Sequence, residues 1–447
     1  MRGQYRLPRF RRQIRDHLCV LLSRSHLSFP QILRRSLNCD PSELSLALDE
    51  LEGAGAVCAQ HDSTPNAVSY CLRTSESRRR SAPAQHGSIA RPVAGPVGSR
   101  RKSYFEAFAD DMLRHLPEPT PIYSQWWFLP SSYSSLVTLL VRTGQANSPA
   151  AFLGCGTLGA AFSRVRTTPV TLLDVDQELL RSLEPFCSSA TSLVHYDVSD
   201  HPDGSLLGKH GLVVVDPPWS RRLLPLFLAR GASLVSVGGS LAISFPQSFT
   251  RPGILHERRE LIRLAGSLGL RLERVIARGT RYAVPPFERA AYGERGIHIK
   301  CPWRAGDLFV FRSVAHLRRD PWPAPVGPSP RWDQFRAGNW RLFLNRDGHA
   351  EAGPPRLRSV AGLARGVCPT VSSRAQYWDD ASLVCTRNRM AIAEGRDQLS
   401  LALQRLFTAP GGGSSRHAVS DISRFSSVSE TMRDWAAGVE TMLRNEL

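Results

Sequence analysis

The most regular alternation of hydrophobic and polar residues lies between residues 150 and 312. Short apolar runs that suit buried strands alternate there with stretches in which apolar residues recur every three or four positions, as on one face of a helix. Strands and helices in turn are typical of a doubly wound α/β sheet. The predicted strands begin at Ala150, Val170, Ser192, Gly211, Gly238, Leu270 and Asp307, and predicted helices cover Leu223–Arg230 and Glu257–Leu268.

Residues 1–73 have a different pattern, with three helical segments followed by two short strands. Helical spacing covers Phe10–Arg24 and begins again at Ser28 and at Pro41. Two later segments resemble strands, Ala56–Cys58 and Ala67–Arg73. This order predicts a winged helix, used either to bind a DNA groove with its third helix or only for packing and dimerisation. The third helix carries acidic residues that weigh against DNA binding: Glu43, Asp49, Glu50 and Glu52.

The other segments complete the predicted domain organisation. Residues 74–103, rich in Ser, Pro, Gly and Arg, predict a basic flexible linker. Residues 104–320 hold the α/β domain, residues 321–410 a small domain, and residues 411–447 a flexible joint with an amphipathic terminal helix, Val428–Leu443. The small domain has strand-like pieces at Trp340–Leu344 and Ala381–Thr386 and a helical one at Gln398–Phe407. The expected fold class is α/β, with a Rossmann-like sheet of seven strands, an N-terminal winged helix and a β-rich and helical C-terminal region.

The charge of the chain adds a candidate partner. The formal net charge is +18, and residues 1–103 contain 17 basic and 8 acidic side chains. Only three of the basic residues of the whole chain are lysines, a skew that codon usage in a GC-rich genome produces by itself, so the local concentration says more than the total. Such a concentration is what attraction to phosphate groups needs, and nucleic acid is a candidate partner of residues 1–103.

Membrane and metal signals are weak. The chain has no apolar run near the roughly 20 residues of a membrane span, and its arginine-rich start lacks the apolar core of a signal peptide, so we expect no membrane contact and a cytoplasmic protein. The nine cysteines form no Cys-x-x-Cys pair and no cluster with histidine. We therefore expect neither a metal site nor a disulfide framework.

A glycine turn and three acidic residues predict a nucleotide pocket. Gly154, Gly156 and Gly159 follow the first strand, where glycine lets the backbone approach a ligand at a helix N-terminus. Asp174 ends the second strand at the usual distance for a carboxylate that accepts ribose hydroxyls, with Asp176 as the second choice. Asp197 ends the third strand and is a candidate acceptor for the adenine amino group.

The fourth strand leads to the candidate reaction centre, Asp216-Pro217-Pro218-Trp219. Its apolar run suits the middle of a buried parallel sheet, which places Asp216 at the carboxyl end where ligands bind. The prolines stiffen the loop and turn carbonyls toward a ligand, and Trp219 offers a flat apolar face. Asp-Pro-Pro-aromatic is typical of enzymes that alkylate an amine nitrogen. With the glycine turn and acids, it predicts a class I S-adenosylmethionine-type fold.

The order of these features resembles the N(4)-bis(aminopropyl)spermidine synthase family, the branched-chain polyamine synthases, from about Arg9 to Arg312. The resemblance implies an aminopropyl transferase acting on a polyamine, with decarboxylated S-adenosylmethionine as donor. It also implies that Asp216 binds the attacking amine, with Trp219 where the family has tyrosine.

One departure from that family concerns the glycine turn. The family's turn reads Gly-Asp-Asp-Asp, whereas this chain has Gly154-Cys155-Gly156-Thr157. Acids would suit a cationic donor and repel the carboxylate of ordinary S-adenosylmethionine. Their absence leaves both donors open, S-adenosylmethionine and its decarboxylated form.

Three functions therefore stay open: an amine transferase acting on a small molecule, a methyltransferase of the adenine exocyclic amine in DNA or RNA, and a non-catalytic regulator that binds DNA. A homodimer is also open. A second Pro-Pro-aromatic segment, from residue 281 to 288, supplies three further candidates for contact with the acceptor, although a plain loop fits equally. They are Tyr282, Phe287 and Glu288.

Overall fold

The computed structural model describes residues 6–61, 68–73, 102–145, 147–299, 301–315, 332–337, 340–345, 347, 356–363, 366–370 and 380–408. The chain divides into two compact units. The first comprises Met1–Arg114, Phe128–Ala283 and Lys300–Trp322, and the second His115–Trp127, Val284–Ile299 and Pro323–Leu447. The first unit ends near the expected boundary after residue 320, but two segments of the expected domain 104–320 group with the C-terminal part of the chain.

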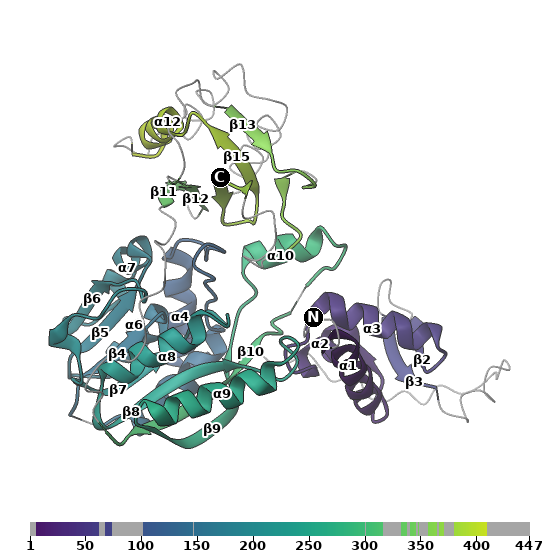
Figure 1. The fold of residues 1–447 in the computed structure, drawn as a ribbon, viewed down its shortest axis with the longest axis horizontal. Helices are drawn as coiled ribbons and strands as arrows, with labels where there is room; N and C mark the ends of the chain where they lie inside the picture. Colours follow the sequence, from purple (N-terminus) through teal and green to yellow (C-terminus); the bar gives the residue numbers. More distant parts are fainter. Residues whose placement is uncertain are drawn as a thin grey trace. The chain divides into compact units, whose positions relative to one another are not determined.

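A seven-stranded sheet forms the centre of the first unit (Figure 1). Its strands are β4 (Ala150–Leu153), β5 (Val170–Asp174), β6 (Thr191–His195), β7 (His210–Val215), β8 (Val235–Pro246), β9 (Leu270–Arg281) and β10 (Ala305–Ser313). They lie in the order β6-β5-β4-β7-β8-β10-β9; the first five pair in parallel, and β10 is antiparallel to both neighbours. The predicted Rossmann-like, methyltransferase-type sheet is confirmed.

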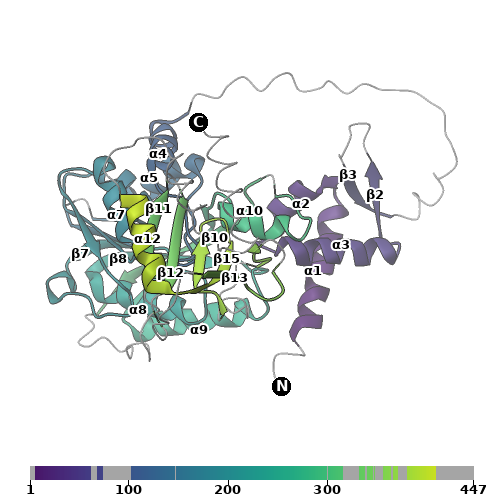
Figure 2. The same cartoon turned by 90° about the horizontal axis from the view of Figure 1, so that it is seen from above.

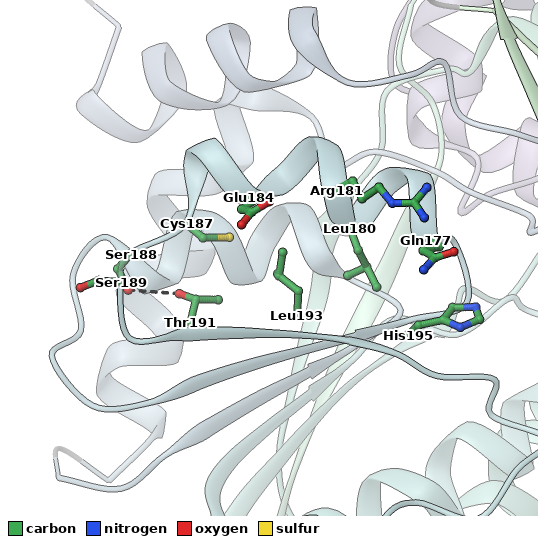
Figure 3. Close-up of a pocket in the computed structure, with 10 residues that line it drawn as sticks. All are labelled: Gln177, Leu180, Arg181, Glu184, Cys187, Ser188, Ser189, Thr191, Leu193 and His195. Atoms are coloured by element: carbon green, nitrogen blue, oxygen red, sulfur yellow. Dashed lines mark hydrogen bonds between the residues drawn. The ribbon is translucent and has the colours of Figure 1, made fainter. Parts of the chain in front are cut away.

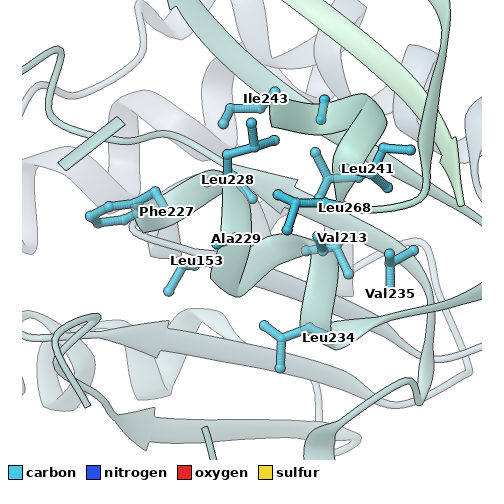
Figure 4. Packing of buried hydrophobic residues seen from close by; sticks show 14 of the residues in the cluster. Leu153, Val213, Phe227, Leu228, Ala229, Leu234, Val235, Leu241, Ile243 and Leu268 are labelled. Carbon is cyan, nitrogen blue, oxygen red and sulfur yellow. The ribbon is translucent and has the colours of Figure 1, made fainter. Parts of the chain in front are cut away.

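Helices connect and cover these strands. They are α4 (Tyr104–His115), α5 (Tyr133–Thr143), α6 (Gly156–Ser163), α7 (Gln177–Leu183), α8 (Leu223–Leu234) and α9 (Ile254–Ser267), with 3-10 turns η2 (Pro130–Ser132), η3 (Glu184–Phe186) and η4 (Gly204–Leu206). Every residue of β4, β5 and β7 is buried, as their continuous apolar runs predict for a covered parallel sheet. Leu228 of α8, Val213 of β7 and Leu241 of β8 belong to one apolar cluster (Figure 4). This cluster anchors the strand that leads to Asp216.

Residues 6–73 form an N-terminal module of three helices and a small sheet (Figure 2). Its elements are α1 (Arg6–Leu22), β1 (Leu27–Ser28), α2 (Phe29–Arg35), α3 (Pro41–Gly53), β2 (Val57–His61) and β3 (Val68–Leu72), and the strands pair in the order β1-β3-β2. Asp40 caps α3 by accepting a hydrogen bond from the backbone of Ser42 at 2.8 Å. The element order agrees with the expected one, with β1 added.

The turn between α2 and α3 contacts the start of β10. Leu37 and Asn38 both have positive φ, +49° and +64°. The Asn38 side chain accepts a hydrogen bond from the Ala305 backbone at 2.7 Å and donates one to the carbonyl of the same residue. The carbonyl of Leu37 also accepts from the backbone of Phe249 at 3.1 Å. The N-terminal module is thus tied to a strand that borders the candidate site.

Within the described residues, the main elements of the second unit are a five-stranded sheet and two helices. The strands are β11 (Trp332–Ala337), β12 (Trp340–Asn345), β13 (Arg356–Ser359), β14 (Leu383–Cys385) and β15 (Met390–Glu394), in the order β11-β12-β14-β15-β13, and the helices are α10 (Pro286–Gly293) and α12 (Arg396–Thr408). The β-rich character agrees with the expectation. Helix α10 begins inside the second Pro-Pro-aromatic segment, where the loop interpretation missed it, because proline is tolerated in the first turn of a helix.

Several expectations fall outside the described residues. These are most of the linker 74–103, the joint that begins at residue 411 and the terminal helix Val428–Leu443. Among the residues that the structure does describe, no helix is both long enough and apolar enough to cross a bilayer.

Candidate active site

The residues predicted at four strand ends lie at the carboxyl ends of the parallel strands, on one side of the sheet. Backbone hydrogen bonds join these ends: Gly154 donates to Leu173 at 2.9 Å, and Asp216 donates to Leu153 at 3.2 Å. The backbone of Tyr196, just before Asp197, donates to the Asp174 carbonyl at 2.9 Å. The structure therefore brings Gly154, Asp174 and Asp216 together and places Asp197 one turn beyond β6, because parallel strands end on the same side.

The glycine turn packs closely against neighbouring residues, which only glycine allows. Gly154 has a φ of +67°, and a Cβ there would lie 3.0 Å from the Phe227 ring and 3.1 Å from the Asp216 carbonyl. At Gly156, the first residue of α6, a Cβ would lie 2.8 Å from Leu183. Gly154 thus serves the turn itself, whereas Gly156 serves close packing at the helix N-terminus. This cradle fits the approach of a nucleotide-like donor to the backbone.

The two acids after β5 have separate tasks. Asp176 is the N-cap of α7 and accepts a hydrogen bond from the Leu179 backbone at 3.2 Å, and its side chain is fully buried. Asp174 is 8% exposed, and its Oδ1 accepts from the Asp176 backbone at 3.0 Å. These contacts favour Asp174 over Asp176 as the ribose acceptor, because Asp176 is committed to the helix.

Asp197 lies in the turn after β6 and is half-buried. Its Oδ1 accepts a hydrogen bond from the Ser199 backbone at 2.8 Å. The neighbouring side chain His195 contacts the Val175 carbonyl at 3.1 Å. The expected contact of Asp197 with an adenine amino group stays a prediction.

Asp216 is bound by a tyrosine from the far half of the sheet. The hydroxyl of Tyr282 donates to Asp216 Oδ1 at 2.6 Å, and Ser244 Oγ lies 2.8 Å from the same hydroxyl. Burial raises the pKa of Asp216 to about 7, and the hydroxyls of Tyr282 and Ser244 act in the opposite direction. The carboxyl group therefore changes its charge close to neutral pH.

Trp219 forms a half-buried aromatic wall beside that carboxyl group. Its ring meets the ring of Tyr282 edge to face, with centroids 5.6 Å apart at 85°. The guanidinium of Arg304 lies 5.5 Å from the Trp219 ring centre, and Arg251 donates to the Trp219 carbonyl. The loop is thus held by contacts at both its ring and its backbone.

The three candidates from the second Pro-Pro-aromatic segment lie in different parts of the structure. Tyr282 is 2% exposed and reaches Asp216, so it supports the candidate centre from behind, where we expected a residue that closes over the acceptor. Phe287 and Glu288 belong to α10 in the second unit and are buried there. Phe287 meets Trp126 edge to face, with centroids 6.0 Å apart. Contact of these two residues with an acceptor stays a prediction.

Sequence reasoning missed Ser244 and Thr280, which complete the surroundings of Asp216. Ser244 Oγ lies 2.9 Å from Thr280 Oγ1, and both side chains are buried. A signal was available for Ser244, since it is a polar residue near the end of the apolar run of β8. No comparable signal marks Thr280, because β9 contains polar residues along its whole length.

A groove of about 570 Å³ lies between α7 and the edge strand β6 (Figure 3). Gln177 and His195 line one end, and Ser188 and Ser189 the other. The Gln177 end adjoins the acids at the ends of β5 and β6. The cavity that touches Asp216 and Ser244 is far smaller, about 10 Å³. Side chains therefore fill the space directly behind the candidate centre.

Comparisons with known proteins agree with this architecture. The family model described as "Probable N6-adenine methyltransferase" matches residues 122–235, which include the glycine turn and Asp216–Trp219. No curated protein matches the chain.

Among solved structures, the chain is similar to the branched-chain polyamine synthase of Thermus thermophilus in complex with N4-aminopropylspermidine and 5'-methylthioadenosine. A C9 mutein of that enzyme is 17% identical, with 69% of this chain and 90% of that chain covered and a TM-score of 0.50. The parent enzyme is 16% identical, with 67% and 87% covered and a TM-score of 0.50. A putative RNA methyltransferase from Pyrococcus horikoshii is 16% identical, with 48% and 99% covered and a TM-score of 0.36.

The fold and the family match confirm an enzyme of the class I S-adenosylmethionine type, with a donor of that type. The similarity to the polyamine synthase extends to the fold only. Neither comparison identifies the transferred group or the acceptor.

Proposed function

We propose that this chain transfers a methyl group from S-adenosylmethionine to the exocyclic amine of adenine in a nucleic acid. The observation that carries the proposal is the pair formed by the Asp216 carboxyl, bound by Tyr282 at 2.6 Å, and the Trp219 ring beside it. An acceptor for N–H groups next to a flat aromatic face suits an aromatic amine. The family match described as an adenine methyltransferase spans both residues.

The proposed chemistry requires little beyond positioning. The donor supplies a carbon already activated by a sulfonium, so holding the amine in line and excluding water contribute most of the rate. Asp216 and the Pro217 carbonyl accept the two N–H groups of the amine, and Trp219 stacks on the base, a contact typically worth about 1–3 kcal/mol. The new C–N bond forms as the C–S bond breaks, and Asp216 takes the proton that the nitrogen releases.

Two features favour a methyl donor that carries a carboxylate. The glycine turn contains Cys155 where the polyamine synthases have an acid, and burial raises the pKa of this thiol well above its usual value. The Cys155 thiol is therefore neutral and donates toward the Val214 carbonyl at 3.5 Å. A neutral turn does not repel the carboxylate of S-adenosylmethionine.

The charges around the loop favour an anionic acceptor over a polyamine. Arg221 and Arg251 both pair with the same carboxylate, Glu257, and Arg304 lies over the Trp219 ring. Cations therefore outnumber anions beside Trp219. This excess repels a polycationic amine and attracts phosphate groups. Aminopropyl transfer to a polyamine remains the second candidate, because a buried carboxylate at Asp216 also suits a cationic amine.

The proposed nucleic-acid partner brings the N-terminal module into consideration. Arg11 and Arg15 of α1 pair with Glu43 and Glu50 of α3 at 3.0 and 3.1 Å. These pairs offset two of the acids that weigh against DNA binding. Contact of residues 1–103 with phosphates, a cytoplasmic location and a homodimer stay predictions.

The test of the proposed function is transfer by the full-length protein. We expect methyl transfer from S-adenosylmethionine to adenine-containing DNA or RNA oligonucleotides, and no aminopropyl transfer from decarboxylated S-adenosylmethionine to spermidine. The variant Asp216→Ala should abolish transfer while calorimetry shows donor affinity within about threefold of the parent, because Asp216 contacts the acceptor. Asp111→Ala, an exposed position on α4, is the matched control.

Three outcomes contradict the proposal. Turnover retained by Asp216→Ala removes the proposed role of this carboxylate. Spermidine as the better acceptor makes the chain a polyamine synthase. Binding of neither donor leaves only the regulator.

A further inference from the structure

The carboxyl group of Asp216 stands at the end of a chain of three hydroxyl groups from β8, from β9 and from the residue just after β9, the two strands that flank β10. Thr280 Oγ1 of β9 lies 2.9 Å from Ser244 Oγ of β8, which lies 2.8 Å from the hydroxyl of Tyr282. Tyr282, just after β9, then donates to Asp216 Oδ1 at 2.6 Å. Since Tyr282 uses its single proton for Asp216, it accepts hydrogen bonds from the hydroxyls of Ser244 and Thr280, and the Ser244 hydroxyl also stabilises the charged form of Asp216. Each donor in such a chain polarises the next.

Two aromatic neighbours fix the ring of Tyr282 from different directions. It stacks on Phe128 with centroids 5.2 Å apart at 25°, and the edge-to-face contact with Trp219 holds it from another direction. Its backbone donates to the Arg304 carbonyl at 3.1 Å. The two ring contacts and the backbone hydrogen bond therefore hold the buried hydroxyl of Tyr282 in one place.

Gly306 of β10 supplies the room for this chain. A Cβ at Gly306 would overlap Ser244 Oγ, and it would lie 2.5 Å from Thr280 Oγ1 and 2.9 Å from the Trp219 ring. No other residue leaves space for the two hydroxyls and the tryptophan at once. Three strand positions and Tyr282 are thus adapted to the surroundings of a single carboxyl group.

We propose that Tyr282 is the positioning residue that orients Asp216 toward the acceptor amine, with Ser244 and Thr280 orienting Tyr282. Tyr282 occupies Oδ1, and Oδ2 then accepts the N–H of the amine. Tyr282 itself does not touch the acceptor. This inference rests on the proposed use of Asp216 in transfer.

The same hydrogen bond favours the ionised form of Asp216. Burial raises the pKa of Asp216, and the hydroxyl of Tyr282 stabilises the charged form. Two other titratable groups interact electrostatically with Asp216, Cys155 of the glycine turn and Tyr133 of α5. Burial raises the pKa of both groups, so both are neutral near pH 7. Removal of the Tyr282 hydroxyl therefore leaves Asp216 protonated over more of the neutral range.

The decisive experiment measures Asp216 directly in the full-length protein. We expect the Asp216 pKa, read from the carboxyl carbon chemical shift in labelled protein without donor or acceptor, to rise by about one unit in Tyr282→Phe, as loss of a hydrogen bond to a charged group predicts. Methyl transfer should then fall about fivefold at pH 7, as the ionised fraction of Asp216 falls, and recover at pH 9. Tyr70→Phe in β3 is the matched control and should leave the Asp216 pKa and the pH profile unchanged.

The readouts separate this inference from the proposed function. An unchanged Asp216 pKa in Tyr282→Phe overturns the inference, whatever the activity. A loss of transfer that is equal at every pH also overturns it, because that pattern indicates a purely structural role. A raised pKa in a protein that methylates no oligonucleotide supports the link between Tyr282 and Asp216 and rejects the proposed function.

Two further variants test the rest of the chain without removing Tyr282. Ser244→Ala removes the donor to Tyr282 and should raise the Asp216 pKa by less than Tyr282→Phe does. Thr280→Val, which keeps the shape of the side chain, should have the smallest effect. A larger effect of Thr280→Val than of Ser244→Ala contradicts the proposed order.

Discussion

A single carboxyl group, Asp216, combines the main chemical features of this protein at the residue scale. It follows a fully buried strand, it accepts a hydrogen bond from Tyr282, and burial raises its pKa to about 7. A group that titrates near neutral pH can accept a proton from a newly alkylated nitrogen and release it again. Ionising such a group in a partly buried site costs stability.

The stability of the protein should therefore depend on pH through Asp216. The pKa of this carboxyl group is near 3.8 in the unfolded chain, whereas burial raises this pKa to about 7 in the folded protein. The stability that the protonated Asp216 contributes is fully present below the unfolded-state pKa. It is lost as the pH rises toward 7, at about 1.4 kcal/mol per pH unit. The side chain of the Asp216→Asn variant cannot ionise. The free energy of unfolding of this variant, relative to that of the parent protein, should therefore increase between pH 5 and 7. Urea denaturation at several pH values measures the difference, and parallel curves contradict the prediction.

Close contact between helices and strands decides how the site is built at the scale of the elements. Gly159 of α6 faces β4 and β5, and a Cβ there would overlap Leu172 and lie 2.8 Å from the Phe152 ring. This approach brings the N-terminus of α6 against the carboxyl end of β4. The glycine turn, the helix and the strand thus form one closely packed unit, which we propose supports the donor.

The variant Gly159→Ala should consequently destabilise the protein. The added methyl group must displace buried side chains of β4 and β5, and overpacking of this kind typically costs about 1–3 kcal/mol. Gly266→Ala in α9 is the matched control, because nothing lies within 4 Å of its added Cβ. Alanine is favoured there over glycine by about 0.5–1 kcal/mol. Thermal or urea denaturation should give opposite signs for the two variants, and equal signs contradict this account.

At the scale of the whole molecule, the first unit joins an N-terminal module to the α/β domain. Asn38 makes two hydrogen bonds to the backbone of Ala305, whose neighbours Arg304 and Gly306 contact Trp219. The turn that carries Asn38 thus supports the strand behind the aromatic wall. The module therefore has a structural task within this unit whether or not it also binds nucleic acid.

Replacement of Asn38 should loosen this support. In Asn38→Ala the buried backbone groups of Ala305 lose both partners, and we expect faster hydrogen exchange at β10 and in the loop of Trp219. Gln60→Ala, an exposed position on β2 in the same module, should leave exchange unchanged. Exchange at β10 that is equal in Asn38→Ala and the parent contradicts the proposed support.

Part of this organisation was predictable because it depends on local pattern. The apolar runs, the glycine turn and the four strand ends determined the α/β class, the seven strands and the place of Asp216, since alternation and strand direction require no knowledge of distant contacts. The helix α10 was missed because its first turn contains proline, which usually indicates a loop. The N-cap bond of Asp176 to Leu179 is visible only in the folded helix, so the sequence left Asp176 as the second choice for the ribose acceptor.

The sequence by itself determined the succession of strands along the chain, the glycine turn and the presence of a carboxylate before two prolines and a tryptophan. Only the tertiary structure decided that Tyr282, 66 positions along the chain, donates to that carboxylate and that Ser244, Thr280 and Gly306 complete its surroundings. The physical reason is that pairing of β8, β9 and β10 sets these neighbours. The pairing depends on register between distant segments, which no local pattern encodes.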